Sequence, residues 1–192
     1  PLRLVGSEMC IRDRIKLENT PVIFISGHFS NFELMAMEIE KSGVNLSAIY
    51  RPLNNVFLNL IMEKIRKKYV CKNQIKKGTG GVRELLKLYK KGYSIALMID
   101  QRVSEGIKSK FFSADAFTTT IPAQFVKKFN CKVVPIYIER HHGINFNINI
   151  ETPIEFTKNC STEKITRDLN IWLEKMILKN PGEWIWSHNR GK

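Results

Sequence analysis

The residues best suited to chemistry lie in a short polar segment that directly follows the apolar run at residues 22–26. The segment reads Gly27-His28-Phe29-Ser30-Asn31-Phe32-Glu33. An unperturbed imidazole has a pKa of about 6.5, so His28 can accept a proton near neutral pH. Glu33 falls in the first turn of the next expected helix, where its carboxylate could hold one ring nitrogen while the other faces a substrate hydroxyl. The spacing therefore predicts a general base with an orienting carboxylate and no protein nucleophile.

Three other interpretations of this segment stay open. Ser30 and Glu33 have the S-x-x-E spacing of a capping box, in which Glu33 only closes a helix N-terminus. His28 could be an ordinary strand-end residue. Ser30 could act as a nucleophile, but a nucleophile elbow needs G-x-S-x-G, and the second glycine position is occupied by Phe32.

The elements that must position these residues alternate between strand and helix patterns. Short β-branched runs predict strands at residues 22–26, 46–50, 94–99, 133–138 and 146–150. Apolar residues at helical spacing predict helices at 34–43, 56–68, 120–129 and from 161 onward. A further helix is expected to open at Gly78, Gly80 and Gly81 and to carry Val82, Leu85, Leu86 and Tyr89 on one face. The alternation predicts a single α/β domain with a largely parallel central sheet flanked by helices. The apolar helix faces, including Val56, Leu60, Ile61 and Ile65, are expected to belong to the core.

Further candidate site residues follow the expected strands, where open α/β sheets place their ligands. Arg51 precedes Pro52 at a strand end, and its planar guanidinium suits a phosphate or a carboxylate. Asp100 and Gln101 end another strand, where they could support Arg51 or a loop. The remaining substrate-binding candidates have structural alternatives as helix caps or solvated residues: Asn31, Asn54, Asn55 and Arg83.

Charge limits the classes of partner. The 192 residues hold 31 Lys and Arg against 18 Asp and Glu, a formal net charge of +13. This excess favours phosphates, acidic lipid head groups, an acidic protein or nucleic acid. Seven basic residues cluster within a short stretch, namely Lys64, Arg66, Lys67, Lys68, Lys72, Lys76 and Lys77. Aromatic residues do not alternate with these lysines as in single-strand stacking platforms, so nucleic acid is not expected. No metal is expected, because His141 and His142 have no third ligand nearby.

Several motifs in order resemble the lipid A biosynthesis acyltransferase family, whose members add secondary lauroyl and myristoyl chains. The resemblance covers residues 20–192. It rests on the following segments: His28-x4-Glu33, Tyr50-Arg51-Pro52 with Asn54-Asn55, Gly80-Gly81-Val82-Arg83-Glu84-Leu85, Asp100-Gln101, Phe111-Phe112 with Thr118-Thr119, Val133-Val134-Pro135, and Trp186-Ser187-His188-Asn189-Arg190. The glycine usual in the family after the paired phenylalanines is Ser113 here.

The resemblance implies a glycerolphosphate acyltransferase-like fold and an O-acyltransferase without a cofactor. The donor would be a fatty acyl thioester on acyl carrier protein, and the acceptor a hydroxyl of a phosphorylated lipid A precursor. His28 would be the base and Glu33 its partner. The protein would work at an anionic membrane surface, on the cytoplasmic face of the bacterial inner membrane. Alternatives are another phosphorylated glycolipid acceptor such as an inositol mannoside, a non-enzymatic basic module that binds membrane or nucleic acid, and a hydrolase.

The first fourteen residues read differently from the rest. They have no clear period, and VGSEMCIRDR resembles the translated read-through of a sequencing adapter. We therefore expect residues 1–14 to be a non-native tail and residues 15–192 to be an acyltransferase domain. The membrane-anchoring helix that family members carry before the histidine motif is expected to be missing, which would leave peripheral membrane attachment.

Overall fold

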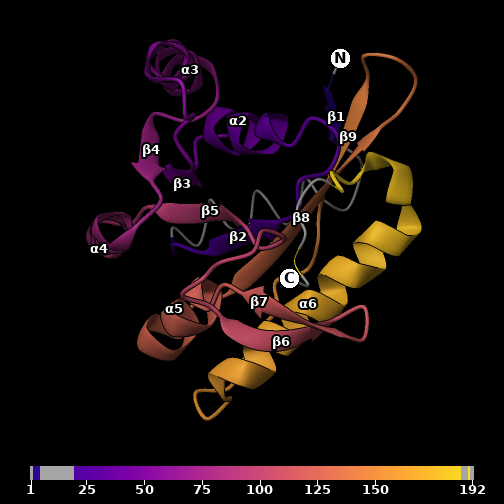
Figure 1. Cartoon of the computed structure of the whole chain (residues 1–192). Helices are drawn as coiled ribbons and strands as arrows, with labels where there is room; N and C mark the ends of the chain where they lie inside the picture. Colours follow the sequence, from indigo (N-terminus) through magenta and orange to yellow (C-terminus); the bar gives the residue numbers. More distant parts are fainter. Residues whose placement is uncertain (1, 5–19, 187–189, 191–192) are drawn as a thin grey trace.

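The computed structural model describes residues 2–4, 20–186 and 190. Its centre is a seven-stranded sheet of order β1-β9-β8-β2-β5-β3-β4 (Figure 1). The strands are β1 (Leu2–Leu4), β2 (Ile23–Ser26), β3 (Leu46–Tyr50), β4 (Asn73–Lys76), β5 (Ser94–Met98), β8 (Val133–Arg140) and β9 (Phe146–Ile150). All neighbouring pairs are parallel except β8 with β9. The expected α/β domain with a largely parallel sheet is confirmed.

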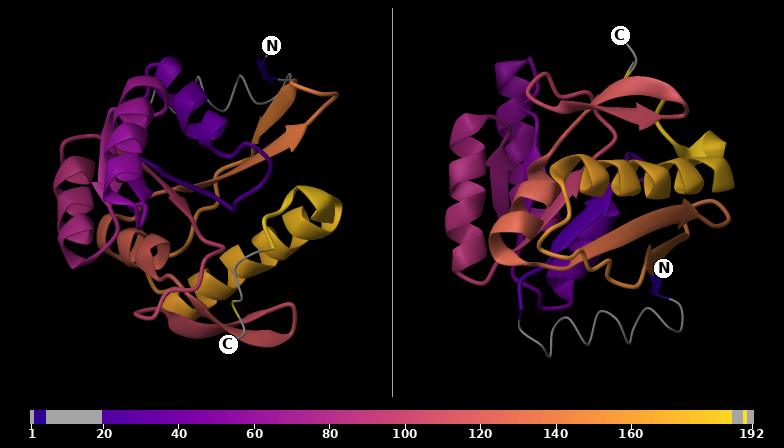
Figure 2. Two further views of the ribbon diagram at one scale, coloured as in Figure 1. Left: turned by 45° about the horizontal axis from the view of Figure 1, so that its top comes forward. Right: turned by 90° about the horizontal axis from the view of Figure 1, so that it is seen from below.

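Helices cover both faces of this sheet. They are α2 (Glu33–Lys41), α3 (Val56–Tyr69), α4 (Thr79–Lys90), α5 (Ile121–Phe129) and α6 (Thr162–Lys179). Right-handed crossovers place α2 and α3 on one face, because the chain then moves in one direction from β2 to β4. The direction reverses after β4, so α4 and α5 lie on the other face, where α6 joins them (Figures 1 and 2).

The longest helix follows the amphipathic pattern of its sequence. Ser161 caps α6 by accepting a hydrogen bond from the backbone N–H of Lys164. Ile165, Leu169 and Leu173 recur at helical spacing and are buried. This helix therefore packs its apolar side against the rest of the domain, as periodicity predicts.

Besides β1, two structured segments lie outside the strands expected from the sequence. β4 carries few β-branched residues, and it forms because Ser47–Tyr50 of β3 offers a parallel ladder to it. A hairpin of β6 (Ile107–Phe111) and β7 (Ala114–Thr118) turns through Phe112 and Ser113, which both have left-handed backbone conformations with φ of 47° and 65°. A glycine would occupy the Ser113 position without strain.

The expectation that every apolar helix face is core is wrong for α3. Val56, Leu60, Ile61 and Ile65 of this helix are exposed to solvent. Asn59 is the buried residue of α3. The periodicity correctly identifies a helix with an apolar side, but that side points away from the protein.

Adjacent glycines at the start of α4 provide a matched test of packing. A Cβ on Gly81 would overlap the backbone carbonyl oxygen of Lys76, whereas a Cβ on Gly80 would meet nothing within 4 Å. We predict that Gly81→Ala destabilises the fold by about 1–3 kcal/mol, because α4 must shift away from β4. Gly80→Ala should stabilise it by about 0.5–1 kcal/mol through helix propensity. Urea unfolding of both variants checks the prediction, and equal midpoints would contradict the packing of α4 on β4.

Candidate active site

The carboxyl ends of four parallel strands bring the polar residues of the site together. His28 follows β2, Arg51 follows β3, Lys77 follows β4, and Gln101 follows β5. Because adjacent parallel strands end at the same edge of a sheet, residues far apart in the chain share one cavity there. In the pairing of β2 with β5, Ser26 lies opposite Met98. His28 and Asp100 each follow two residues after this pair, so the register places them beside each other.

Asp100 holds the imidazole of His28. Its Oδ1 lies 2.7 Å from Nδ1 of His28, and its Oδ2 accepts a hydrogen bond of 2.7 Å from the His28 backbone N–H. The indole N–H of Trp184 donates to the same Oδ2 at 2.9 Å. Asp100 is fully buried, while the His28 side chain is 13% exposed. The carboxylate therefore fixes the ring from behind and leaves one edge of it accessible.

Hydrogen bonding keeps the Asp100 carboxyl ionised despite its burial. Burial raises the pKa of a carboxyl group, but hydrogen bonds from the His28 ring, the His28 backbone and Trp184 outweigh that effect. The pKa of Asp100 consequently lies below its ordinary value. A carboxylate only accepts hydrogen bonds, so Nδ1 of His28 carries a hydrogen, and in the neutral ring Nε2 then presents a lone pair.

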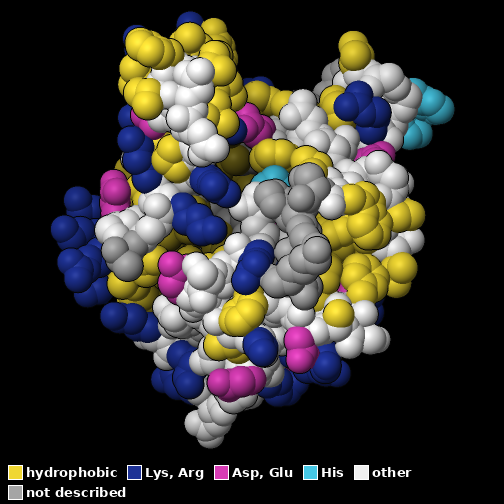
Figure 3. Space-filling model, viewed as in Figure 1, with side chains coloured by type: hydrophobic (Ala, Val, Ile, Leu, Met, Phe, Trp, Pro, Cys, Tyr) yellow, Lys and Arg dark blue, Asp and Glu magenta, His cyan; other side chains and the backbone are white. Residues whose placement is uncertain are grey.

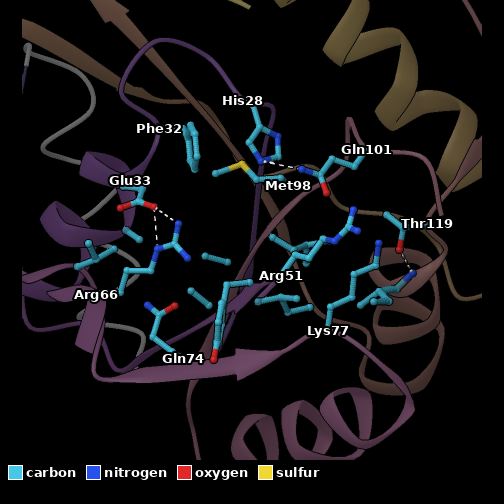
Figure 4. Close-up of a pocket in the computed structure, with 18 of the residues that line it drawn as sticks. His28, Phe32, Glu33, Arg51, Arg66, Gln74, Lys77, Met98, Gln101 and Thr119 are labelled. Carbon is cyan, nitrogen blue, oxygen red and sulfur yellow. Dashed lines mark hydrogen bonds and ion pairs between the residues drawn. The ribbon is translucent and has the colours of Figure 1, made fainter. Parts of the chain in front are cut away.

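Gln101 contacts that second nitrogen. Its Nε2 atom lies 3.1 Å from Nε2 of His28. Because the ring nitrogen is an acceptor in this tautomer, the amide of Gln101 is the donor. The same nitrogen faces the cavity at which Gln101, Met98 and Phe32 meet (Figure 4). This is the geometry of a neutral imidazole that can accept a proton from a group in the cavity.

Glu33 lines the same cavity, but it contacts Arg66 where a contact with His28 is expected. Its Oε1 accepts hydrogen bonds from Nε and Nη2 of Arg66 at 2.8 and 2.6 Å. Both ring nitrogens of His28 are engaged by other residues, Asp100 and Gln101. The carboxylate on Nδ1 is thus supplied by Asp100, because a residue at the end of the adjacent β5 reaches that nitrogen directly.

The capping-box alternative for this segment also differs from the structure. The N-cap of α2 is Phe32, with no side-chain cap hydrogen bond. Ser30 has a left-handed backbone with φ of 44°, and its hydroxyl is buried without a hydrogen-bond partner. The loop is held instead by the C-terminal segment, whose Ile185 N–H donates to the His28 carbonyl and whose Glu183 carbonyl accepts from the Ser30 N–H.

The cavity has a volume of about 270 Å³ and is mixed in character. Apolar side chains of β3 and β5, among them Ala48, Ala96 and Met98, line its inner wall. Three cationic side chains also line it, from different elements: Arg51, Arg66 and Lys77 (Figure 4). An apolar wall beside a group of cations suits a molecule that carries both a hydrocarbon chain and an anionic group.

The structure separates the other substrate-binding candidates. Gln101 and Arg51 line the cavity, and Asp100 lies buried behind His28. Asn55 caps α3 by accepting a hydrogen bond from Leu58 N–H, as the cap alternative predicts. The candidates that are exposed and line no part of the cavity are Asn31, Asn54 and Arg83.

Sequence reasoning missed several residues of the site. Arg66 and Lys77 were grouped with a basic surface cluster, although both line the cavity. Trp184 carries no signal for contact with Asp100 beyond its position shortly before the C-terminal motif. In that motif Arg190 is buried and donates to Thr118 Oγ1 at 2.8 Å, and burial lowers its pKa to about 10. Ser187, His188 and Asn189 lie outside the described residues.

Within the part of the chain that the structure describes, three or more His, Cys, Asp or Glu side chains nowhere gather as a possible metal site. His141 and His142 are exposed at the turn between β8 and β9, as expected of a solvated turn.

The chain is similar in sequence and in fold to known acyltransferases. Lipid A biosynthesis acyltransferase 2 from Shigella flexneri is 20% identical over 182 residues, which cover 92% of this chain and 57% of the relative. The chain thus spans a little over half the length of that relative. The crystal structure of the 1-acyl-sn-glycerophosphate acyltransferase PlsC from Thermotoga maritima has a TM-score of 0.53 at 14% identity. The matched region covers 96% of this chain and 73% of the PlsC chain. This similarity confirms the expected glycerolphosphate acyltransferase-like fold.

A match to a sequence family settles the classification. Residues 7–192 match the family described as bacterial lipid A biosynthesis acyltransferase. That match takes in the loop after β2, the strand ends that form the cavity and the C-terminal segment that contacts Asp100. The chain therefore belongs to the bacterial lipid A biosynthesis acyltransferase family.

Proposed function

We propose that the chain carries the catalytic centre of an O-acyltransferase in which His28 is the general base. The observation that supports this most directly is the imidazole itself. Its Nδ1 is held by the buried carboxylate of Asp100, and its Nε2 faces a cavity with an apolar wall and cationic residues. The tautomer, the exposure and the neighbouring space all suit deprotonation of a bound alcohol.

In the proposed reaction an acceptor hydroxyl donates its proton to Nε2 of His28 as its oxygen attacks a thioester carbonyl carbon. The tetrahedral intermediate collapses by breaking the carbon–sulfur bond, and the leaving thiolate takes the proton from the imidazolium. The products are an ester and a free thiol, so atoms and charge balance. Asp100 keeps the ring oriented and stabilises the imidazolium between the two proton transfers.

The side-chain amide of Gln101 occupies the hydrogen-bonding position on Nε2 of His28 that the acceptor hydroxyl would take. The amide donates to Nε2 at 3.1 Å, the separation that an alcohol oxygen would have when donating to the same nitrogen. Binding of the acceptor therefore exchanges one donor for another on Nε2, and the side chain of Gln101 turns aside. The exchange leaves the contact between Asp100 and Nδ1 in place, so the ring keeps its orientation.

The cations of the cavity support a phosphorylated acceptor. Arg51, Arg66 and Lys77 lie beside the space that His28 faces, and guanidinium groups bind phosphate oxygens in pairs (Figure 4). The family favours a lipid A precursor, with the hydroxyl of a 3-hydroxyacyl chain as the nucleophile. Phosphorylated inositol mannosides offer the same chemistry, and so does a lysophosphatidic acid such as the substrate in the name of the solved structure.

Acyl carrier protein is the proposed donor carrier, because an acidic protein complements a chain of net charge +13. The apolar wall of the cavity would take the fatty acyl chain. The proposed location is the cytoplasmic face of the inner membrane, where acyl carrier protein and lipid acceptor meet. None of the described helices is long and apolar enough to cross a bilayer.

The first experiment supplies the detergent-solubilised chain with a radiolabelled acyl thioester of acyl carrier protein and a tetra-acylated lipid A precursor. We expect acyl transfer, and a loss of about 10²–10⁴-fold in His28→Ala, the usual contribution of a positioned general base. Parallel reactions replace the precursor with an inositol mannoside or lysophosphatidic acid. Full transfer by His28→Ala would refute the mechanism, and salt-sensitive nucleic-acid binding without any transfer would favour a binding module.

The second prediction separates the two carboxylates. Asp100→Asn should lower kcat by about 10²–10⁴-fold with little change in KM, because the amide favours the wrong imidazole tautomer. Glu33→Gln is the matched control, and it should cost less than about tenfold in kcat and act mainly on KM through Arg66. Steady-state kinetics check both variants, with circular dichroism to verify folding. Losses of kcat of equal size would indicate that Glu33 holds His28 during turnover.

The third prediction concerns pH. Gln101→Glu places a carboxylate 3 Å or so from Nε2 of His28, as judged from the amide separation of 3.1 Å. The negative charge favours the imidazolium, so the neutral base is present only at higher pH. We expect the acidic limb of the kcat/KM profile to move upward by about one pH unit or more. Gln101→Met, which removes the amide without adding charge, should leave the limb in place, and an unshifted limb in Gln101→Glu would argue against His28 as the base.

A further inference from the structure

Helix α3 is amphipathic in the opposite sense to the other helices. The residues that face the protein are mostly polar, namely Asn59, which is buried, with Glu63 and Arg66, and the half-buried Met62 lies among them. In its first two turns the residues that face outward are apolar. Among them are Val56, Phe57, Leu58 and Leu60, with exposures of 69%, 80%, 54% and 55%. A helix that packs against a protein core has the reverse arrangement.

The inward polar face is well satisfied, so the outward apolar face is not the result of a loosely attached helix. Asn59 Oδ1 accepts from the Leu53 N–H, and its Nδ2 donates to Glu63 at 2.7 Å. The Tyr50 hydroxyl also donates to Glu63, and these hydrogen bonds lower the pKa of Glu63 to about 2. Arg66 pairs with Glu33 on α2. Hydrogen bonds to the carboxyl groups of Glu63 and Glu33 therefore fix the rotation of α3 about its axis.

The apolar face forms one contiguous patch, not scattered residues. Leu53, Val56, Phe57, Leu58, Leu60, Ile61 and Ile65 are all exposed. Figure 3 shows hydrophobic side chains covering the outer side of α3, at the top of that view, with basic side chains at the flank of the same part of the molecule. Exposed apolar patches of this kind mark an interaction site.

The basic residues around the patch indicate what it contacts. Lys64, Lys67 and Lys68 are exposed on α3 itself, and Lys72 and Lys77 are exposed in the segment that follows. Long lysine side chains beside exposed Phe, Leu and Ile match the composition of helices that lie in the interface of an anionic bilayer. A second protein with a purely apolar surface would leave these cations unpaired, whereas the acidic head groups of a bilayer would pair with them beside its apolar chains.

The length of α3 decides how it meets the bilayer. Its 14 residues span about 21 Å at 1.5 Å per residue, short of the roughly 30 Å hydrocarbon core. Charged residues on its inner face also exclude insertion across the membrane. We propose that α3 lies in the plane of an anionic bilayer surface, with its apolar face among the acyl chains and its lysines among the head groups.

The placement also connects the membrane to the site. Arg66 projects from the inner side of α3 into the cavity that His28 faces. A lipid acceptor that leaves the bilayer beneath α3 would meet the cations of the cavity without crossing bulk water. This last consequence rests on the proposed function, whereas the docking of α3 does not require it.

The test measures binding to phosphatidylcholine vesicles with and without phosphatidylglycerol by co-sedimentation. The wild-type chain should bind the anionic vesicles, and more weakly at high salt. The double variant Phe57→Ser with Leu60→Ser should bind at least tenfold more weakly. The matched control, Ile144→Ser with Leu178→Ser, removes two apolar residues that are 83% and 69% exposed elsewhere, and should bind like wild type. Lys64→Gln with Lys67→Gln and Lys68→Gln should abolish the preference for phosphatidylglycerol.

Two further measurements keep docking separate from catalysis. His28→Ala should bind vesicles like wild type, so a failure of acyl transfer would leave the docking of α3 intact. Light scattering without lipid should give the mass of a monomer. The proposal is overturned if wild type ignores anionic vesicles, if the two serine variants lose equal affinity, or if the chain is a dimer that Phe57→Ser with Leu60→Ser converts to monomers.

Discussion

A buried carboxylate is the constraint on which the site depends. Asp100 is fully shielded from water, and an unpaired charge in that position would be strongly destabilising. It is tolerated because the backbone and ring of His28 and the indole of Trp184 converge on it. Those three hydrogen bonds join the end of β5, the loop after β2 and the C-terminal segment. The orientation of the imidazole is consequently a property of the whole fold, since no one of these segments could set it alone.

The two carboxylates near His28 differ in burial and therefore in the group that each one contacts. Asp100 is enclosed and holds the ring of His28, whereas Glu33 lies partly exposed at the cavity and pairs with Arg66. Only one of them therefore shares a hydrogen bond with the base. The other sets the charge and position of a cation that is available to an anionic ligand. The parallel topology makes this division possible, because neighbouring strands deliver their terminal residues to one edge of the sheet.

Helices α6 and α3 share an apolar side at helical spacing, but that side faces the core in α6 and the protein surface in α3. The apolar residues of α6 are buried, whereas those of α3 face outward above an ionised polar network. The network costs apolar burial but holds the rotation of α3, so that Arg66 stays at the cavity. Helix α3 thus connects the surface with the site, because its exposed side is apolar and Arg66 on its inner side lines the cavity.

The sequence by itself determined the elements and the position of His28, the proposed base. Periodicity located the long helices and most strands, the caps at Ser161 and Asn55 are local, and His28 follows a recognisable buried strand. Only the tertiary structure decided which carboxylate meets His28, because Asp100 lies 72 residues away and reaches it through the β2–β5 register. It also decided which way α3 faces. Periodicity shows that a helix has an apolar side. Whether that side faces the core or the protein surface depends on which residues of the rest of the chain contact the helix.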